Sequence, residues 1–373
     1  MTGASTPKSV LWLRTHSRRG VLVEHLRHVA GSFAAAGWQV EHGERPRVPS
    51  GAAVAVLDDP WVEPLPRLAS ALAAARAAGS PAWRVPRVSG LQGPQGWNPA
   101  SPPATMREYE RATVQERRVS ALDLGPAAWC GFAVSAGEDA AALLAAGWPP
   151  RGAVVLPNAY LFRYADPAAH ERRELLPFVP EAARSVVDVG CGSGLFGSVL
   201  RRAGRWVVGI EPDWELAVRA AGRLNAVLPM AGQEGLRALR APVDCLVFAD
   251  VLEHTAAPQD LLRLAATMVG PMGRIVVSFP NAAWAPVARA LAAGRWDLTL
   301  AGVQARDHLF FTTPHSFASL AAECGLTVES MAPLGHGGVS RWGRARGRLA
   351  AWVAGGDPET SVSPQWAAVL RAT

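Results

Sequence analysis

The sequence of 373 residues predicts an α/β protein, and two observations lead to this fold class. The apolar run 186–189 passes through a glycine-rich turn into a helix, which is typical of a parallel sheet covered by helices. Strand-like and helix-like segments also alternate through much of the first 170 residues. We therefore expect two α/β domains, a smaller one over residues 1–170 and a second one over residues 171–373.

The glycine-rich turn has the features of a nucleotide-binding loop. Glycines at 190, 192 and 194 allow a sharp turn and a close approach of a ligand, and the following helix N-terminus presents unpaired N–H groups. A second apolar strand, 206–210, is closed by Glu211, whose carboxylate suits two ribose hydroxyls. The sequence thus predicts a site for a cofactor that contains a ribose.

The glycines alone leave two cofactor classes open. The segment 192–197 also satisfies the dinucleotide pattern G-x-G-x-x-G, which would make the protein an oxidoreductase. Asp188, two positions before the first glycine, favours the other class. Its carboxylate would repel a pyrophosphate but attract the ammonium and sulfonium groups of S-adenosylmethionine (SAM).

From Asp188 onward the chain resembles the class I SAM-dependent methyltransferases, in the branch that includes ubiquinone-biosynthesis O-methyltransferases. The resemblance implies SAM as cofactor and a Rossmann-like, mostly parallel, seven-stranded sheet with one antiparallel strand, for which 365–371 is the last strand. The motifs that carry it are the fourth strand and V-L-E-H turn at 244–254, the fifth strand and P-N ending at 273–281, the insertion with D-H-L-F-F-T at 307–312, and the sixth strand at 325–328.

The resemblance assigns cofactor-binding residues by position. Many relatives have an acidic residue after the third strand, facing the adenine, where this chain has Gly232-Gln233-Glu234. The amide oxygen of Gln233 can still accept a hydrogen bond. Asp213 is expected to cap a helix rather than to contact the ligand. The expected cofactor-binding residues are Asp188, Gly190, Gly192, Gly194, Glu211, Gln233 and Asp250.

Methyl transfer to a hydroxyl requires an aligned acceptor, exclusion of water and removal of a proton. His308, in the insertion, and His254, at the end of the fourth strand, are the candidate catalytic bases. Each has a structural alternative: His308 would fasten the insertion to the core, and His254 with Glu253 would anchor a helix start. The resemblance also leaves open a divalent metal on Asp250, Glu253 and His254, although we assign no metal ligand from the sequence.

The first 170 residues carry weaker signals. A proline- and glycine-rich stretch at 85–104 breaks the pattern, and the early alternation implies a small parallel layer. The expected elements are strands at 9–14, 38–41 and 52–57 and helices at 21–36, 65–78 and 106–121.

Two further strands, 131–135 and 152–158, flank a helix at 137–146. This arrangement resembles the end of the acceptor-side domain of two-domain (GT-B) glycosyltransferases. The donor-sugar domain that should follow is missing, since the methyltransferase motifs begin instead. We therefore expect the first domain to hold a glycan acceptor or to pack on its neighbour, and we do not expect glycosyl transfer.

Composition excludes several classes. The formal charge is +6, but no basic run is interleaved with stacking aromatics, so no nucleic-acid partner is expected. The four cysteines, at 130, 191, 245 and 324, form no C-x-x-C pair, so neither a disulfide framework nor a zinc site is indicated. With no signal-peptide pattern and no apolar run of about 18 residues, we expect a cytoplasmic protein without an integral membrane segment.

These observations predict a SAM-dependent methyltransferase that methylates a hydroxyl of a saccharide or of another small molecule. Two alternatives from other classes stay open. One is a non-catalytic partner protein that retains SAM affinity, and the other is the dinucleotide-dependent oxidoreductase.

Overall fold

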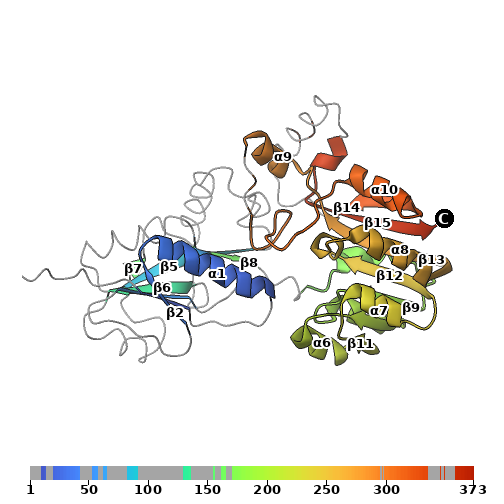
Figure 1. Cartoon of the computed structure of the whole chain (residues 1–373), viewed down its shortest axis with the longest axis horizontal. Coiled ribbons are helices and arrows are strands. Elements are labelled where there is room, and N and C mark those ends of the chain that lie inside the picture. Colours follow the sequence, from blue (N-terminus) through green and yellow to red (C-terminus); the bar gives the residue numbers. More distant parts are fainter. Residues whose placement is uncertain are drawn as a thin grey trace, which may run out of the picture. The chain divides into compact units, whose positions relative to one another are not determined.

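The computed structural model describes residues 10–13, 20–42, 53–57, 62–64, 82–90, 129–135, 154–155, 161–164, 170–294, 296, 298–334, 345, 348 and 358–373. The chain divides into two compact units (Figure 1). One comprises Met1–Trp97 and Thr105–Ala165, and the other comprises Asn98–Ala104 and Asp166–Thr373. Each unit is built on its own sheet.

The first unit contains an eight-stranded mixed sheet in which β1 pairs in parallel with β2 and β3, and β6 pairs antiparallel with β3 and β5. Seven strands follow the order β2-β1-β3-β6-β5-β8-β4, and β7 pairs with β5. Helix α1 (Gly20–Ala35) connects the first two strands. The strands are β1 (Val10–Leu13), β2 (Gln39–His42), β3 (Ala53–Leu57), β4 (Val62–Pro64), β5 (Ala82–Gly90), β6 (Trp129–Ser135), β7 (Val154–Val155) and β8 (Leu161–Tyr164).

The predicted parallel layer is confirmed for β2-β1-β3 but is wrong beyond β3, where β6 runs antiparallel. The predicted break at 85–104 is also wrong over its first residues, because β5 continues to Gly90. The pairing of β5 with β6 shifts register between Arg84 and Pro86, as expected where proline cannot donate to the ladder. The helices predicted at 65–78, 106–121 and 137–146 lie outside the described residues.

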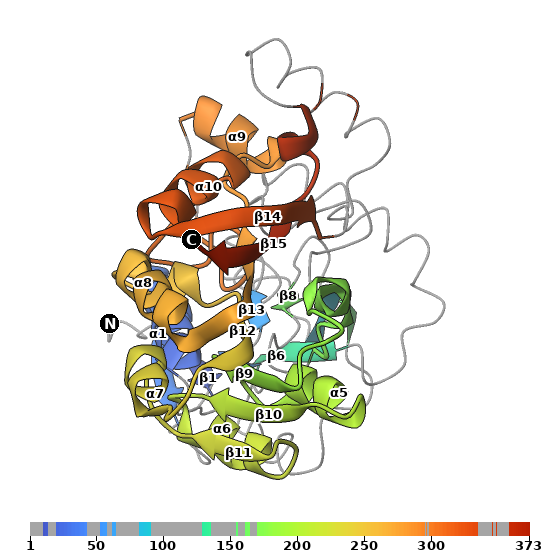
Figure 2. The ribbon, with the colours of Figure 1, turned by 90° about the vertical axis from the view of Figure 1, so that its right-hand side faces the viewer.

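The second unit has the expected seven-stranded sheet, in the order β11-β10-β9-β12-β13-β15-β14 (Figure 2). Among the described strands of this sheet, β15 alone runs antiparallel, to both of its neighbours, so the prediction of one antiparallel strand is confirmed. The strands are β9 (Ser185–Val189), β10 (Trp206–Ile210), β11 (Ala226–Leu228), β12 (Val243–Ala249), β13 (Val269–Pro280), β14 (Leu326–Pro333) and β15 (Gln365–Ala372). The α-helices are α5 (Leu195–Arg202), α6 (Trp214–Ala221), α7 (Gly232–Ala238), α8 (Pro258–Met268), α9 (Ala285–Ala292) and α10 (Pro314–Glu323).

Both faces of this sheet are covered by apolar side chains, as parallel strands require. Alternate residues of β9 enter different clusters: Val187 and Val189 pack with residues of α8 and α10, whereas Val186 packs with Leu200 of α5. Asp188 therefore faces the α5 side, where a Cβ at Gly197 would lie 3.4 Å from its Oδ2 atom. A carboxyl group is thus inserted into an apolar layer directly before the glycine turn.

Cys191, Cys245 and Cys324 have free, buried thiols. Burial raises the thiol pKa of all three above the ordinary value. They lie in the glycine turn, in β12 and at the end of α10. Within the described ranges, every helix is too short or too polar to cross a lipid bilayer.

Candidate functional site

The glycine turn joins β9 to α5 beside the end of β10. The N–H groups of Gly190 and Cys191 both donate to the carbonyl of Ile210, at 2.7 and 3.1 Å. Gly190, Gly192 and Gly194 all have positive φ angles, of 69°, 55° and 77°, which L side chains rarely adopt. A Cβ at Gly190 would also lie 2.7 Å from Cγ2 of Val251. The predicted strand, turn and helix are thus present, and the turn packs against the residue that follows Asp250.

Glu211 braces this turn from the end of β10. Its Oε2 atom accepts a hydrogen bond from the Gly192 N–H at 2.8 Å, and Oε1 accepts one from the Asp213 N–H at 2.9 Å. Asp213 in turn accepts a bond from the Leu216 N–H at 3.1 Å, so its prediction as a helix cap is confirmed. Each carboxylate oxygen of Glu211 has a second lone pair, so these backbone contacts are compatible with the expected ribose contact.

Asp188 is almost completely buried, with 2% of its surface exposed, and its Oδ2 atom has no hydrogen-bond partner among the described residues. Burial, and then the negative charge of Glu211, raises the pKa of Asp188 to about 7. A cation beside this group would lower the pKa again. The side chain therefore has the electrostatic character that a positively charged ligand would complement.

Gln233 is the second residue of α7 and is half-buried. A Cβ at the preceding Gly232 would lie 3.0 Å from Cγ1 of Val189, so the start of α7 packs against the end of β9. The expected adenine-facing residue is therefore carried on an element that borders the glycine turn. Its contact with adenine stays a prediction.

Asp250, also expected to bind cofactor, is occupied by protein groups. Its carboxylate accepts hydrogen bonds from Arg172 Nη1 at 2.5 Å, Ser278 Oγ at 2.7 Å and Gln365 Nε2 at 2.6 Å. Burial alone would raise the pKa of Asp250, but the Arg172 guanidinium and these hydrogen bonds hold it below the ordinary value. The structure thus joins Asp250 to three residues that the sequence reasoning missed.

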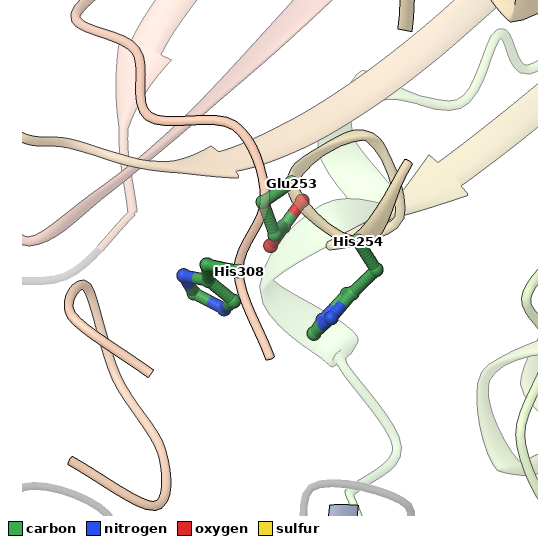
Figure 3. Close-up of side chains that lie close together, drawn as sticks. All are labelled: Glu253, His254 and His308. Atoms are coloured by element: carbon green, nitrogen blue, oxygen red, sulfur yellow. The ribbon is translucent and has the colours of Figure 1, made fainter. Parts of the chain in front are cut away.

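Glu253, His254 and His308 converge just beyond the end of β12 (Figure 3). A short 3-10 turn, Leu252–His254, brings the first two together, and the insertion supplies His308. One ligand atom from each residue can be chosen so that all lie within 4.8 Å of one another. The two imidazole rings meet edge to face, with centroids 4.9 Å apart. Both candidate histidines therefore belong to one cluster, whereas Asp250 is held by Arg172 instead.

The insertion is fastened to this turn by backbone hydrogen bonds. The N–H groups of Leu309 and Phe310 both donate to the carbonyl of Glu253, at 2.6 and 3.1 Å. His308 Nδ1 lies 3.0 Å from the carbonyl oxygen of Val303, which can only accept, so Nδ1 carries the proton. Burial and the neighbouring His254 lower the pKa of His308 to about 4. In this neutral tautomer, Nε2 keeps a lone pair for a proton or a metal ion.

Glu253 is 3% exposed, and its Oε2 atom has no hydrogen-bond partner among the described residues. Burial, and then the charge of Asp250, raises the pKa of Glu253 well above its ordinary value. A buried carboxyl group without a partner is costly unless a proton, a ligand or a metal ion completes its interactions. One carboxylate and two imidazoles form a donor set suited to a divalent transition metal.

A separate cavity of about 470 Å³ lies along α5. None of the predicted site residues lines it, and its lining arginines already bind an acid or backbone carbonyls. It is therefore distinct from the site formed by the glycine turn and the histidine cluster. Its lining residues are Glu171, Leu195, Ser198, Arg201, Arg202 and Arg223.

Residues 160–331 match the family model of a methyltransferase domain. Together with the seven-stranded sheet, this match identifies the second unit as a class I SAM-dependent methyltransferase domain, and the family resemblance is confirmed. SAM is accordingly its cofactor.

Among its relatives, ubiquinone biosynthesis O-methyltransferase from Cupriavidus pinatubonensis is 29% identical over 168 residues, which cover 43% of this chain and 67% of the relative. The enzyme of the same name from a Methylobacterium species is 28% identical, with 48% of this chain and 74% of the relative covered. A solved SAM-dependent methyltransferase from Archaeoglobus fulgidus aligns with a TM-score of 0.39 and 18% identity, covering 53% of this chain and 90% of that one.

Proposed function

We propose that the protein methylates oxygen, using SAM to modify a hydroxyl of a saccharide or of another small molecule. The observation that carries this proposal is the position of the histidine cluster. Val251 packs against Gly190 of the glycine turn, and Glu253 and His254 follow directly. A group that can take a hydroxyl proton would therefore lie beside the cofactor turn.

The roles of the residues follow from their chemistry. The methionine end of SAM would meet Asp188 and the glycines at 190, 192 and 194, while Glu211 would receive the ribose hydroxyls and Gln233 the adenine. The sulfonium methyl group is already electrophilic, so the protein needs to align the acceptor and receive its proton. His308 Nε2, neutral in the free protein, is the better placed acceptor of that proton, with His254 as its neighbour.

A divalent metal ion is the second candidate for activating the hydroxyl. The unpartnered buried oxygen of Glu253 favours it, and Glu253, His254 and His308 would be the ligands. Such an ion would lower the pKa of a bound hydroxyl. Asp250 is left out of this set, because Arg172, Ser278 and Gln365 already bind its carboxylate.

For the first unit we propose a role in holding the acceptor. Support comes from the similarity of 131–135 and 152–158 to the acceptor side of GT-B glycosyltransferases, and the observed strands Trp129–Ser135 and Val154–Val155 fall within or overlap these segments. We accordingly propose that residues 1–170 bind acceptor and residues 171–373 transfer the methyl group. A saccharide is the first acceptor class to test.

Calorimetric titration with SAM and S-adenosylhomocysteine tests the cofactor site. We expect Asp188→Asn and Glu211→Gln each to weaken binding by about 1–3 kcal/mol, because each removes a charge-assisted contact. Asp244→Asn, on the exposed start of β12, is the matched control and should bind as the wild type does. Unchanged affinity in both site variants would refute the assigned cradle, and binding of NAD(H) in place of SAM would revive the oxidoreductase alternative.

Acceptor screening with saccharides and hydroxylated small molecules then tests the histidines. We expect His308→Gln to keep its affinity for S-adenosylhomocysteine and to lose kcat by about 100-fold or more, as for a missing general base. If EDTA abolishes turnover and a divalent transition-metal ion such as Mn²⁺ or Zn²⁺ restores it, the metal is required. Full activity in both His308→Gln and His254→Gln would exclude either role.

A further inference from the structure

Arg172 and Asp250 share an unusual backbone conformation. They are the two non-glycine residues with positive φ, 48° and 57°, in the part of the chain that the structure describes. This left-handed region is unfavourable for L residues and persists only where surrounding contacts enforce it. The two residues lie 78 positions apart and are joined side chain to side chain. The strain is therefore concentrated at one ion pair.

The ion pair belongs to a network that ties four segments together. Besides its bond to Asp250, Arg172 donates from Nη2 to Ser278 Oγ at 3.2 Å and from Nε to Glu174 at 2.6 Å. Gln365, at the start of β15, donates to both oxygens of Asp250 at 2.6 Å. The segment before β9 is thus bound to the ends of β12, β13 and β15 through one carboxylate.

The network controls where the chain goes after β12. The Asp250 N–H donates to the carbonyl and hydroxyl oxygens of Ser278, at 3.3 and 3.1 Å, so both the backbone and the side chain of this residue are fixed. Its left-handed conformation turns the chain into Val251, which packs against Gly190, and then into the turn that carries His254. Movement of Asp250 would therefore shift the glycine turn and the histidine cluster relative to each other.

A purely stabilising role explains this arrangement poorly. The side chains of Arg172 and Asp250 are only 17% and 27% exposed, and ion pairs removed from water in this way add little net stability. Two strained residues add a further cost. Such costs are typical of functional sites, where the geometry itself is needed.

We propose that Arg172 is a positioning residue for methyl transfer, which holds Asp250 and thereby sets the histidine-bearing turn against the cofactor turn. In this role Arg172 acts through Asp250 and the turn that follows it. The part of this inference that gives the turn a role in methyl transfer rests on the proposed function. The coupling between Arg172 and the turn does not depend on it.

Hydrogen–deuterium exchange of the full-length chain tests the coupling without an acceptor. The amides of His254, Thr255, Leu309 and Phe310 report on the turn, because their N–H groups bond within it or to the Glu253 carbonyl. In Arg172→Gln we expect these amides to exchange at least 10-fold faster, with β9 and β10 unchanged. Arg172→Lys, which keeps the charge but not the planar fork, should give an intermediate rate.

The neighbouring Arg173 provides the matched control, since its side chain is 64% exposed and bonds only Glu171 among the described residues. Arg173→Gln should exchange as the wild type does.

The double variant Arg172→Gln/Asp250→Asn removes the buried charge that Arg172→Gln leaves unpaired. Its thermal midpoint should therefore be higher than that of Arg172→Gln, while its turn amides still exchange fast. With an identified acceptor, Arg172→Gln and the double variant should each lose at least 10-fold in kcat at an unchanged KM for SAM.

Two results would overturn the inference: turn amides of Arg172→Gln that exchange at the wild-type rate, or faster exchange spread equally over the whole sheet. Titration with S-adenosylhomocysteine separates this failure from failure of the proposed function. A wild-type protein that does not bind this ligand would refute the function. Normal binding together with an unperturbed turn in Arg172→Gln would refute only the positioning role.

Discussion

At the scale of single residues, the methyltransferase unit contains three buried carboxyl groups near its candidate site. Asp188, Glu211 and Glu253 are each no more than 6% exposed, and the first and last have an oxygen without a partner among the described residues. Burying such groups costs free energy that packing elsewhere must offset. They lie around the cofactor turn and the histidine cluster, where a bound cation or a transferred proton would neutralise their charge. The carboxyl groups that lower the stability of the ligand-free protein are thus those expected to strengthen ligand binding.

Asp188→Asn should change how stability depends on pH. The folded-state pKa of about 7 lies above the ordinary value near 3.8, so the stabilising contribution of Asp188 is fully present below about pH 4 and is lost as pH rises through 7. The unfolding free energy of the wild type, relative to Asp188→Asn, should therefore fall by up to about 1.4 kcal/mol per pH unit across this window. Urea titrations of ligand-free protein at pH 4, 5.5, 7 and 8 measure it.

Asp244→Asn provides a control of opposite sign. Hydrogen bonds from the Ser185 and Arg184 N–H groups and from the Ser185 hydroxyl hold the pKa of Asp244 below its ordinary value. The stabilising contribution of Asp244 is therefore present above the ordinary pKa of an aspartate and is lost as the pH falls. If the difference in unfolding free energy between the wild type and Asp188→Asn stayed constant from pH 4 to 7, the raised pKa of Asp188 would be contradicted.

At the scale of elements, the start of α6 couples helix capping to the cofactor turn. Asp213 caps the helix and also donates its N–H to Glu211, which holds Gly192. Asp213→Ala should lower the unfolding free energy by about 1 kcal/mol, because the Leu216 N–H loses its acceptor. Asp213→Asn retains an acceptor oxygen and should lie close to the wild type. Chemical denaturation of the three proteins provides the comparison, and equal stability of Asp213→Ala and wild type would refute the cap.

Helix α7 approaches β10 through a glycine. A Cβ at Gly235 would lie 2.5 Å from Cγ2 of the fully buried Ile210, so Gly235→Ala should destabilise the protein by about 1–3 kcal/mol through overpacking. Gly31 in α1 is the matched helical glycine, with nothing within 4 Å of an added Cβ. Gly31→Ala should therefore stabilise α1 by up to about 1 kcal/mol. If both variants shifted the thermal midpoint in the same direction, this difference in packing would be contradicted.

At the scale of the whole molecule, the division into two compact units predicts two calorimetric transitions. S-adenosylhomocysteine at 100 times its dissociation constant should stabilise the methyltransferase unit by about 2.7 kcal/mol and move one transition upward. The other transition should stay in place, because the expected cofactor residues all belong to one sheet unit. Glu211→Gln, which weakens binding, should show a smaller shift at the same concentration. A single transition that moves as a whole would show that the units unfold together.

The fold of the second unit could be predicted because its signals are local. The apolar strand before Gly190, the strand that ends at Glu211 and the cap at Asp213 each depend on residues close in sequence, and all three were found. In the first unit, β5 was missed because Pro86 indicates a break, whereas the strand accommodates it through a register shift. Pairing direction was also missed, because it depends on distant strands.

The network around Asp250 illustrates what a local pattern does not contain. A carboxylate after the fourth strand has the same local sequence whether it binds a ligand or an arginine 78 positions away. Ser278 and Gln365 did offer a signal, since each is a polar residue in or at the start of an apolar strand. Arg172 lies before the first motif in a run of charged residues, and nothing in the sequence distinguishes it from Arg173.

The three buried cysteines can serve as native labelling sites that report on local opening of the structure. Because the thiols of Cys191, Cys245 and Cys324 are enclosed and protonated at neutral pH, an alkylating reagent can modify each one only when its surroundings open. Pulse labelling followed by mass spectrometry would thus time the opening of the cofactor turn, the sheet centre and the end of α10 separately. Cofactor should slow the labelling of Cys191 most, since that thiol lies within the turn that a bound ligand would close.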